Sequence, residues 1–485
     1  MNKASGTDKD VTAETLRYGG EKVRHGLLNI CNSVFNGADA PQQWKEHIII
    51  PVPKKSSKRM TDYRGITLMS IAGKVYNRMI LNRIYDPINE RLRPYQAGFR
   101  RGHSCLEQIH ILKRVMEAYQ QRQLPLIAIF IDFSKAFDSV DREMIWKILR
   151  HYGVPVKIVS AISALYRGCS NRVRISGQLS EPFTVNTGVL QGDTLAPFLF
   201  VVVLDYVLRQ THPDCGLRTH PDVTLPDLDF ADDIVLLDPE ENRAGRHFRD
   251  LVHAARAVGL AVNYQKTKLM YCNCIPSQPT HDDLRQIDIV TDFKYLGSRI
   301  VSSLEDFRQR KAIAWNKFWQ LSNVWRSKTI DITLKLRLFD SLILSILLYG
   351  AEAWSLTQRM KKQLNAFGTS CYRVMLGIRR IDRVSNAHVL QKTKRSNISD
   401  KLLQQQLRTL GHWLRRPDGE NIKRYALYTT NQGRGRRGRP PHTYVKNILS
   451  LLNMDEAEIR TLAANRDEWR TLVNVVGRGD SRAPD

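Results

Sequence analysis

Carboxylates follow or interrupt two apolar segments of this 485-residue sequence. Asp132 comes directly after the apolar residues 126–131, and Asp232 and Asp233 lie within the segment 229–237. Apolar runs of this length are typical of buried strands, and functional groups often lie where strands end. Mg²⁺ is usually bound by one or two carboxylates together with substrate phosphates. If the two strands are neighbours, Asp132 and Asp232 can hold two metal ions for phosphoryl or nucleotidyl transfer; the alternative is that each acid only caps a strand or a helix.

The composition predicts a folded protein with an acidic partner. Hydrophobic residues make up 42% of the chain, charged residues 25% and aromatic residues 8%, which is enough apolar surface for the cores of about two to four domains. Lys and Arg number 74 against 48 Asp and Glu, so the formal net charge is +26. An excess of this size points to nucleic acid or an anionic membrane surface, and it argues against an enzyme that acts only on small molecules.

Several features predict an intracellular protein without a membrane partner. The seven cysteines are irregularly spaced, which fits no disulfide framework and favours a reducing compartment. The start of the sequence is polar and charged, so no secretory signal is expected there. The most apolar run, residues 338–349, contains Asp340 and is shorter than the ~20 residues of a membrane span. We therefore expect this run to be a core helix.

Hydrophobic periodicity predicts an α+β fold up to about residue 302, followed by long amphipathic helices. Strands or hairpins are expected at 126–131, 172–190, 225–237 and 287–301, with acids at the tip of the 225–237 hairpin. Helices are expected around 145–152, with an N-cap at Asp138 or Ser139, and at 195–209 and 246–258. The chain after residue 377 is rich in arginine and includes the Gly/Arg-rich segment 433–441, so it is expected to be an exposed linker or arm that buries no core.

Five sequence blocks occur in an order that resembles a known family. They are residues 130–138, with Asp132 and Phe137; 188–197, with Gln191 and Gly192; 230–233, with the Asp pair; 259–268, with Lys266 and Lys268; and 293–297, Phe-Lys-Tyr-Leu-Gly. Segments 44–55, 62–70 and 96–104 are similar to further blocks of the same family. Together they resemble the reverse transcriptase of non-LTR (LINE-type) retrotransposons. The resemblance covers essentially the whole chain, strongly over 44–300 and more weakly after that.

The resemblance implies a right-hand polymerase with fingers, palm and thumb. On this basis residues 1–125 are the N-terminal extension and fingers, 126–302 the palm with part of the fingers, and 303–376 the helical thumb. Residues 377–485 are a basic C-terminal region with an Arg/Gly-rich linker. The palm is an antiparallel sheet backed by helices.

The same resemblance implies an RNA template, a DNA primer or target DNA, and deoxynucleoside triphosphates as partners. It implies intracellular action in the nucleus, with assembly on RNA in the cytoplasm. The chain starts at the entry motif of this group, and Cys272, Cys274 and His281 do not have the spacing of a zinc site. We therefore expect a fragment of a longer polyprotein that lacks its endonuclease domain.

The resemblance assigns the catalytic and metal-binding residues. Asp132 and Asp232 are expected to bind Mg²⁺, with Mn²⁺ as the alternative ion. Asp233 supports the second carboxylate position, and the backbone carbonyl of Phe133 completes a metal shell. Phe137 would lie under the sugar of the incoming nucleotide, where its ring collides with a 2′-hydroxyl, the group that distinguishes ribonucleotides. The alternative for Phe137 is an ordinary core residue.

Further residues are expected to bind the nucleotide. Lys54 and Arg64 lie where the fingers of this family grip the triphosphate, and Arg64 is the preferred ligand because a guanidinium suits phosphate oxygens. Gln191 and Gly192 resemble the segment that packs against nucleotide and template. Lys266 or Lys268 is expected to protonate the departing pyrophosphate as a general acid, and the sequence leaves the choice between them open.

Two more sites concern the primer and nucleic acid. The hairpin from Phe293 through Tyr295, Leu296 and Gly297 is expected to hold the primer end, although any packed hairpin shows such aromatics. Four arginines of the C-terminal segment are expected to bind nucleic acid by charge: Arg434, Arg436, Arg437 and Arg439. The core of this segment also resembles an AT-hook, but a generic basic linker explains it equally.

Three functions fit these residues. The first is an RNA-directed DNA polymerase. The second is a catalytically silent nucleic-acid binder descended from such an enzyme, against which the retention of all three aspartates argues. The third, an RNA-templated RNA polymerase or intron-encoded maturase, shares the same chemistry, but Phe137 speaks against ribonucleotide use. Thr194, Ala196 and Phe230 depart from the usual residues of the family, and none is a proposed ligand.

Overall fold

Strand β3, Leu126–Ile131, lies in the middle of a five-stranded sheet, and all six of its residues are buried. The strand order is β11-β10-β3-β9-β8. The bounds of the other four strands are β8 Asp227–Phe230, β9 Asp233–Asp238, β10 Lys268–Cys272 and β11 Asp288–Ile289. Both neighbours of β3 pair with it antiparallel, and β8 and β9 form a hairpin. The expectations of a buried strand at 126–131 and of a hairpin with acids at its tip are confirmed.

Alternate residues of β3 belong to two different cores. Ile127, Ile129 and Ile131 pack into one core, whereas Leu126, Ala128 and Phe130 pack into the other. This follows from the two-residue period of a strand, because successive side chains point to opposite faces of the sheet. Both faces are covered, so the run reads as continuously apolar rather than alternating.

The following helices lie between residues 13 and 257, and all of them except the most N-terminal one contribute side chains to the first core. Their bounds are α1 Ala13–Tyr18, α2 Gly20–Phe35, α3 Gln42–Lys45, α4 Ile71–Asn89, α6 Ala136–Ser139, α7 Arg142–His151, α8 Val156–Tyr166, α9 Ala196–Leu208 and α10 Glu241–Ala257. The expected apolar helix at 195–209 is α9, which is buried almost all round. The expected N-cap at Asp138 or Ser139 is wrong. The short helix α6 takes up those residues, and the carboxylate of Asp141 accepts the Met144 N–H at 2.9 Å.

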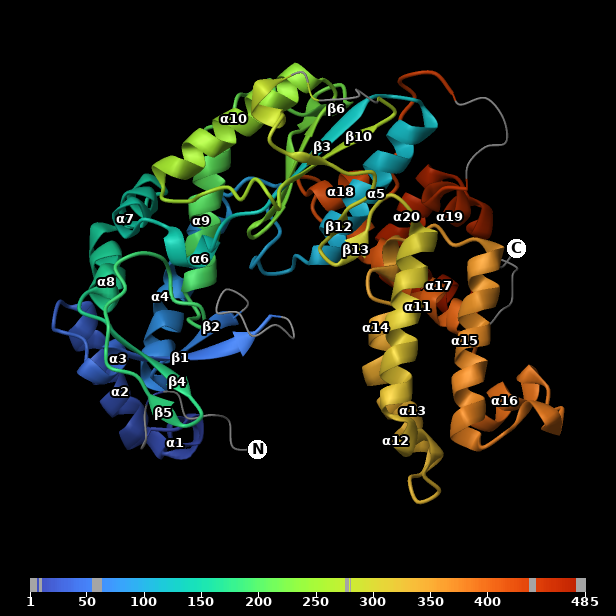
Figure 1. The fold of residues 1–485 in the computed structure, drawn as a ribbon, viewed down its shortest axis with the longest axis horizontal. Coiled ribbons are helices and arrows are strands. Elements are labelled where there is room, and N and C mark those ends of the chain that lie inside the picture. The colour runs from blue at the N-terminus through green and yellow to red at the C-terminus, as the bar shows by residue number, and fades with distance from the viewer. Residues whose placement is uncertain are drawn as a thin grey trace.

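A second sheet, of order β2-β1-β4-β5, lies on the N-terminal side (Figure 1). Its bounds are β1 Glu46–Pro53, β2 Tyr63–Leu68, β4 Ser170–Ile175 and β5 Gln178–Leu179. Strand β1 pairs antiparallel with β2 and parallel with β4. The strand expected to continue to residue 190 ends at Leu179. Beyond it the chain is a loop, because Arg142 donates hydrogen bonds to three carbonyls of residues 185–188 that a neighbouring strand would otherwise use.

Residues 303–376 are helical, as expected, and form a third core to which Val389, Ile398 and Leu402 also contribute. The bounds are α11 Ser303–Gln320, α12 Ser322–Arg326, α13 Ile332–Phe339, a π-helical segment Asp340–Leu344, α14 Ser345–Leu347 and α15 Gln358–Leu376. Figure 1 shows these helices (yellow to orange) on the side of the molecule opposite the second sheet, with the five-stranded sheet between them at the top. The two small hairpins are β6 Leu217–His220 with β7 Val223–Leu225, and β12 Lys294–Tyr295 with β13 Ser298–Arg299.

The expectation that the chain after residue 377 buries no core is wrong. Its helices are α16 Asn386–Thr393, α17 Ile398–Leu414, α18 Asn421–Tyr425, α19 Tyr444–Leu452, α20 Glu456–Ala464 and α21 Arg466–Val476. Helices α17 to α21 bury apolar side chains against the second face of the five-stranded sheet and against α5, Cys105–Gln121. The ring of Trp413 lies 4.4 Å from that of His110, which is on α5. Arginines on the outer faces of amphipathic helices had masked this core in the composition.

The computed structural model describes residues 7, 11–54, 63–274, 279, 281–435 and 442–476. Within this part of the chain, none of the helices is both long and apolar enough to cross a membrane.

Candidate active site at the ends of β3, β8 and β9

Three carboxylates meet where β3 ends and the β8–β9 hairpin turns. Asp132 is the residue after β3, and Ile131 pairs with Ile234, so the register places Asp132 opposite Asp233. Asp232 occupies the two-residue turn of the hairpin, next to Ala231, which has a left-handed φ of 56°. The structure therefore brings together Asp132, Asp232 and Asp233.

Burial and neighbouring carboxylates raise the pKa values of Asp232 and Asp233. Desolvation raises the pKa of Asp232, and the charge of Asp132 adds to it, while the backbone N–H of Asp232 and the charge of Arg64 act in the opposite direction. The pKa of Asp233 is raised to about 6, first by desolvation and then by the charges of Asp232 and Asp132. A cluster of anions that repel one another needs a counter-charge when all are ionised.

The donor set fits a hard divalent cation. All three side chains offer carboxylate oxygens, which such ions prefer. Asp132 Oδ2 is buried and accepts no hydrogen bond from the described residues. Lys266 Nζ lies 3.5 Å from this oxygen and provides part of the missing counter-charge. Phe133 is buried and forms an isolated antiparallel β-bridge with Val262, on the segment that leads to Lys266.

A buried segment from Gln96 to Gly98 holds the hairpin turn. Gln96 Oε1 accepts the N–H of Ala231 at 2.9 Å and that of Gly98 at 2.7 Å. A Cβ on Gly98 would lie 2.2 Å from the backbone N of Ala231, so only glycine allows this close approach. The block 96–104 indicated that this segment matters, but nothing in the sequence showed that it contacts the Asp232 turn.

An ion network lies beneath the same hairpin. Arg93 contacts Asp227 at 2.7 Å, Asp229 at 3.0 Å and Asp205 at 3.3 Å, and all three acids are buried. Burial raises the pKa of Asp229 well above its ordinary value, and Asp227 adds to the rise while Arg93 opposes it. Sequence reasoning missed Arg93. Because Asp227 and Asp229 both belong to β8, the network fixes the strand that carries the turn.

The ring of Phe137 is packed between two other aromatic rings. It stacks on Phe200 with a centroid distance of 4.4 Å and an interplanar angle of 23°. Phe99 meets it edge-on at 6.3 Å and 84°. Phe137 is partly exposed, so one part of the ring is free to contact a ligand. Phe99 was not among the expected site residues.

The second sheet presents positive charge toward the carboxylates. Arg64 is exposed on β2 and Lys54 is exposed just after β1. Burial raises the pKa of Asp138, while the charges of Lys135, Lys54 and Arg64 lower it. The charge of Arg64 acts on Asp232 as well, so both acids lie within the electrostatic range of Arg64.

Gln191 and Gly192 pack against the end of β2. The backbone carbonyl of Gln191 accepts the N–H of Thr67 at 2.7 Å. Gly192 has a φ of 126°, and a Cβ there would lie 2.3 Å from the carbonyl oxygen of Thr67. The loop before them is held by Arg142, whose guanidinium donates to the carbonyls of Val185, Thr187 and Gly188 at 2.7, 3.2 and 3.0 Å.

The two candidate lysines differ in their surroundings. Lys266 is exposed and lies beside Asp132. Lys268 Nζ donates to the carboxylate of Asp288 at 2.5 Å and to the carbonyl of Gln265 at 2.6 Å. The structure thus places Lys266, but not Lys268, in contact with the carboxylate cluster.

The hairpin β12–β13 packs beside the carboxylates. Phe293 stacks on Phe130 of β3 at 4.1 Å, and the hydroxyl of buried Tyr295 donates to the carbonyl of Leu228 at 3.0 Å. The Tyr349 hydroxyl donates to the carbonyl of Leu296 at 2.9 Å, and the Arg310 guanidinium donates to that of Gly297. Burial raises the pKa of Tyr295, and nearby charges that include Asp233 add to the rise. This hairpin is therefore close to Asp233.

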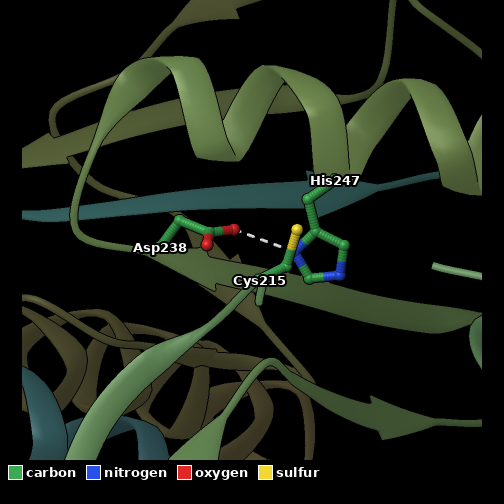
Figure 2. Close-up of side chains that lie close together, drawn as sticks. All are labelled: Cys215, Asp238 and His247. Atoms are coloured by element: carbon green, nitrogen blue, oxygen red, sulfur yellow. Dashed lines mark hydrogen bonds and ion pairs between the residues drawn. The ribbon is translucent and has the colours of Figure 1, made fainter. Parts of the chain in front are cut away.

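Among the described residues, one group of three potential metal ligands has all its ligand atoms within 4.8 Å of one another: buried Cys215, Asp238 and His247 (Figure 2). His247 Nδ1 lies 2.8 Å from one carboxylate oxygen of Asp238, and the other oxygen accepts the Gly216 N–H at 2.7 Å. Asp238 ends β9 at the opposite end from Asp233, roughly 17 Å away at about 3.3 Å per residue. The cluster ties α10 to the sheet and lies outside the carboxylate site.

The arginines expected to bind nucleic acid divide into two groups. Arg434 is described and exposed. Arg436, Arg437 and Arg439 lie outside the described residues.

Comparison with known proteins identifies the family. The family described as "Reverse transcriptase (RNA-dependent DNA polymerase)" matches residues 52–300, which contain every carboxylate of the site. The "Probable RNA-directed DNA polymerase from transposon BS" of Drosophila melanogaster is 28% identical over 386 residues, 74% of this chain and 41% of that protein. The chain is also similar to the "Retrovirus-related Pol polyprotein from type-2 retrotransposable element R2DM" of Drosophila melanogaster, with 30% identity over 220 residues, 45% of this chain and 20% of that protein.

A third similar protein is also named as a polymerase of a mobile element. The "RNA-directed DNA polymerase from mobile element jockey" of Drosophila melanogaster is 24% identical over 383 residues, 74% of this chain and 40% of that protein. The chain thus spans about 40% or less of the length of these relatives. The matched segment covers just over half of the chain and includes the block order seen in the sequence. The α+β chain belongs to the reverse transcriptase family, in the group encoded by non-LTR retrotransposons.

Proposed function

We propose that the protein is an RNA-directed DNA polymerase that adds deoxynucleotides to the 3′-hydroxyl of a DNA primer on an RNA template. The observation that carries the proposal is the meeting of Asp132, Asp232 and Asp233 at the ends of adjacent strands, with Arg64 facing them from the second sheet. Two-metal nucleotidyl transfer needs carboxylates in such an arrangement. The net charge of +26 supports nucleic acid as the partner.

Asp132 and Asp232 would hold Mg²⁺ or Mn²⁺, with Asp233 and the carbonyl of Phe133 completing the ligand set. Bound metal ions would lower the pKa of the attacking hydroxyl and stabilise the charge on the leaving oxygen. The buried Asp132 Oδ2 without a hydrogen-bond donor supports this assignment. So does the repulsion that raises the pKa of Asp233, because a cation relieves it.

Basic residues would bind the triphosphate and supply a proton. Arg64 and Lys54 are exposed at the second sheet, and the charge of Arg64 acts on Asp232, so both would pair with phosphate oxygens. Lys266 is our choice for the donor of a proton to pyrophosphate, because it lies 3.5 Å from Asp132 whereas Lys268 is bound to Asp288. General-acid catalysis requires the donor near the leaving oxygen, and metal ions held by Asp132 would bring pyrophosphate to the Lys266 side of the site.

Phe137 would exclude ribonucleotides, and Gln191 and Gly192 would pack on the nucleotide and template. Phe137 is fixed by Phe200 beneath it and is partly exposed, which suits a ring that must not move aside for a 2′-hydroxyl. The backbone of Gly192 lies against Thr67, so a change of side chain there would move Gln191.

The rest of the chain would grip the nucleic acid. We assign the second sheet and its helices to the fingers, the five-stranded sheet to the palm and the helices 303–376 to the thumb. Phe293 to Gly297 would hold the primer end, and the C-terminal arginines, Arg434 among them, would bind phosphate. The site of action would be the nucleus, with assembly on RNA in the cytoplasm.

Primer extension tests the proposal. The complete chain is supplied with an RNA template, a DNA primer, deoxynucleotides and Mg²⁺ or Mn²⁺, beside the variant Asp232→Asn/Asp233→Asn. We expect extension by the unsubstituted chain and none by the variant, with both binding the template equally. Tight, salt-sensitive RNA binding by both without extension by either would instead support the silent nucleic-acid binder.

A further inference from the structure

Phe99 has a backbone conformation and an exposure that folding alone does not explain. Its φ is 55°, in the left-handed region that bulky residues rarely adopt, and its side chain is 49% exposed. Glycine would adopt this conformation without strain. A strained backbone that carries an exposed aromatic ring is a reason to look for a function of that ring.

The chain on both sides of Phe99 is rigidly held. On one side are the Gln96 contacts to Gly98 and Ala231, and the Ala97 N–H donates to the carbonyl of Asp229 at 2.9 Å. On the other side, the guanidinium of Arg100 donates to the carbonyls of Arg93 and Gln96, both at 2.9 Å. The loop therefore holds the ring of Phe99 in one place rather than leaving it to find its own contacts.

The ring of Phe99 is held against the ring of Phe137. The two rings meet at 6.3 Å and 84°, a favourable edge-to-face geometry. Phe200 stacks on Phe137 at 4.4 Å. Phe200 is buried in α9, so it supports Phe137 from within the core, and Phe99 supports it from the solvent side. Without Phe99, the core would hold the Phe137 ring from one side only.

We infer that Phe99 is a positioning residue that fixes the ring of Phe137 and thereby sets discrimination between deoxyribonucleotides and ribonucleotides. This inference rests on the proposed function, because it requires Phe137 to face the nucleotide sugar. Phe99 acts through Phe137. The strained loop also joins this support to the turn that carries Asp232, so the sugar contact and the carboxylates keep a fixed relation.

The variant Phe99→Gly separates this role from a structural one. Glycine relieves the left-handed strain while removing the ring, so the unfolding temperature is expected to stay equal or rise. Discrimination, the ratio of kcat/KM for a deoxynucleotide to that for the matching ribonucleotide, is expected to fall roughly 2- to 10-fold, as for loss of one aromatic pair. Phe99→Tyr keeps the ring and should retain the original ratio.

Two further variants serve as references. Lys394→Gly relieves strain at another exposed left-handed residue, φ 51°, far from the site in sequence, and should change stability without changing discrimination. Phe137→Ala should lower discrimination roughly 10- to 100-fold, and adding Phe99→Gly to it should cause no further loss, because the two rings act as one unit.

The possible results distinguish failure of the inference from failure of the proposed function. If Phe99→Gly discriminates like the unsubstituted chain while Phe137→Ala does not, the inference is wrong and the proposed function stands. An equal fall of kcat/KM for both nucleotides in Phe99→Gly also overturns it. The ring of Phe99 would then stabilise the fold or the Asp232 turn rather than position Phe137. Absence of extension by the unsubstituted chain contradicts the proposed function itself, and the inference falls with it.

Discussion

Lys266 Nζ lies 3.5 Å from Asp132 Oδ2, so the segment just before β10 contacts the residue that follows β3. Lys268, two residues further on, is at the start of β10 and donates to Asp288 instead. Sequence alone left the two lysines equivalent, because both belong to the same block. Their different partners arise from the pairing of β10 with β11, which brings Asp288 next to Lys268.

Replacing Lys266 is expected to slow the chemical step. We expect Lys266→Met to lower kcat for primer extension roughly 100-fold or more, the lower range for loss of a general acid. Lys268→Met is the matched control and should lower kcat little. Single-turnover kinetics at saturating Mg²⁺ and nucleotide measures both. If Lys266→Met is slow at low Mg²⁺ but matches the unsubstituted chain at saturating Mg²⁺, the lysine serves only as a counter-charge for Asp132; equal losses in both variants would contradict the assignment.

Asp233 makes the metal-free protein sensitive to pH. Its pKa rises from the ordinary value of 3.8 to about 6 in the folded protein. The folded state therefore binds this proton more tightly than the unfolded state, and the stability that it contributes is lost as the pH rises from about 4 through about 6. Asp233→Asn removes this loss, so we expect it to raise the unfolding temperature in EDTA at pH 7.5.

Thermal unfolding at two pH values tests this expectation. At pH 4 the unsubstituted chain and Asp233→Asn should differ little, because Asp233 is protonated in the folded state at that pH. At pH 7.5, Mg²⁺ should stabilise the unsubstituted chain more than the variant, since the ion relieves the same repulsion. A variant that is no more stable than the unsubstituted chain at pH 7.5 in EDTA would show that the three carboxylates are not crowded.

Much of the carboxylate site could be predicted from the sequence because its signals are local. An apolar run that ends in Asp132, and a pair of acids within another run, are visible without knowing the fold. Pairing of β3 with β9 and of β9 with β8 then brings these carboxylates together. What supports these residues could not be predicted in the same way. Gln96 binds Ala231 across 135 positions of sequence and Arg93 binds Asp229 across 136, and no local pattern encodes such contacts.

In the fold, too, features with local sequence signals were predictable and features that depend on distant contacts were not. The buried strand β3 and the apolar helix α9 have unmistakable runs of apolar residues, and they were predicted. The strand pattern of residues 180–190 was misleading, because alternation shows what could pair but not whether a partner is present. The loop binds Arg142 instead. The strand pattern does not show which donor binds these carbonyls, because that depends on the tertiary structure.

Arg142 is expected to control nucleotide affinity through the loop that it holds. Arg142→Lys keeps the charge but cannot donate to three carbonyls at once. We expect the KM for deoxynucleotides to rise roughly tenfold, with a smaller change in kcat, because the loop carries Gln191 and Gly192. Hydrogen exchange of residues 185–192 should become faster. Unchanged exchange together with an unchanged KM would show that the loop is held by its other contacts, such as the bond from Gly188 N–H to the Val140 carbonyl at 2.7 Å.

Phe137→Ala is expected to admit ribonucleotides. Removing the ring opens space for a 2′-hydroxyl, and a steric contact of this size typically changes discrimination roughly 10- to 100-fold. Phe183→Ala is a suitable control, because Phe183 is also a partly exposed phenylalanine but lies in the loop after β5, where it bridges to Asn171 of β4. Extension with a single matched ribonucleotide measures the effect. If Phe137→Ala lowers kcat/KM for both nucleotides equally, Phe137 is an ordinary packing residue, the alternative that the sequence left open.

Trp413 tests whether the C-terminal helices share a core with the sheet. It is 2% exposed and packs on His110 of α5. Trp413→Ala is expected to lower the free energy of unfolding by about 3 to 5 kcal/mol, the usual cost of such a cavity. Trp319→Ala is the matched control: Trp319 is 45% exposed on α11, so its loss should cost at most about 1 kcal/mol. Urea unfolding followed by circular dichroism measures both.

Hydrogen exchange locates the effect of Trp413→Ala. Phe130 of β3 and Trp413 belong to one apolar cluster, so loosening the C-terminal helices should reduce the protection of the β3 amides that lead to Asp132. An independent C-terminal arm, as the composition had suggested, would instead lose its own protection and leave β3 unchanged. The first result would mean that the residues after 377 help to hold the strand that leads to Asp132, although none of those that the structure describes belongs to the carboxylate cluster.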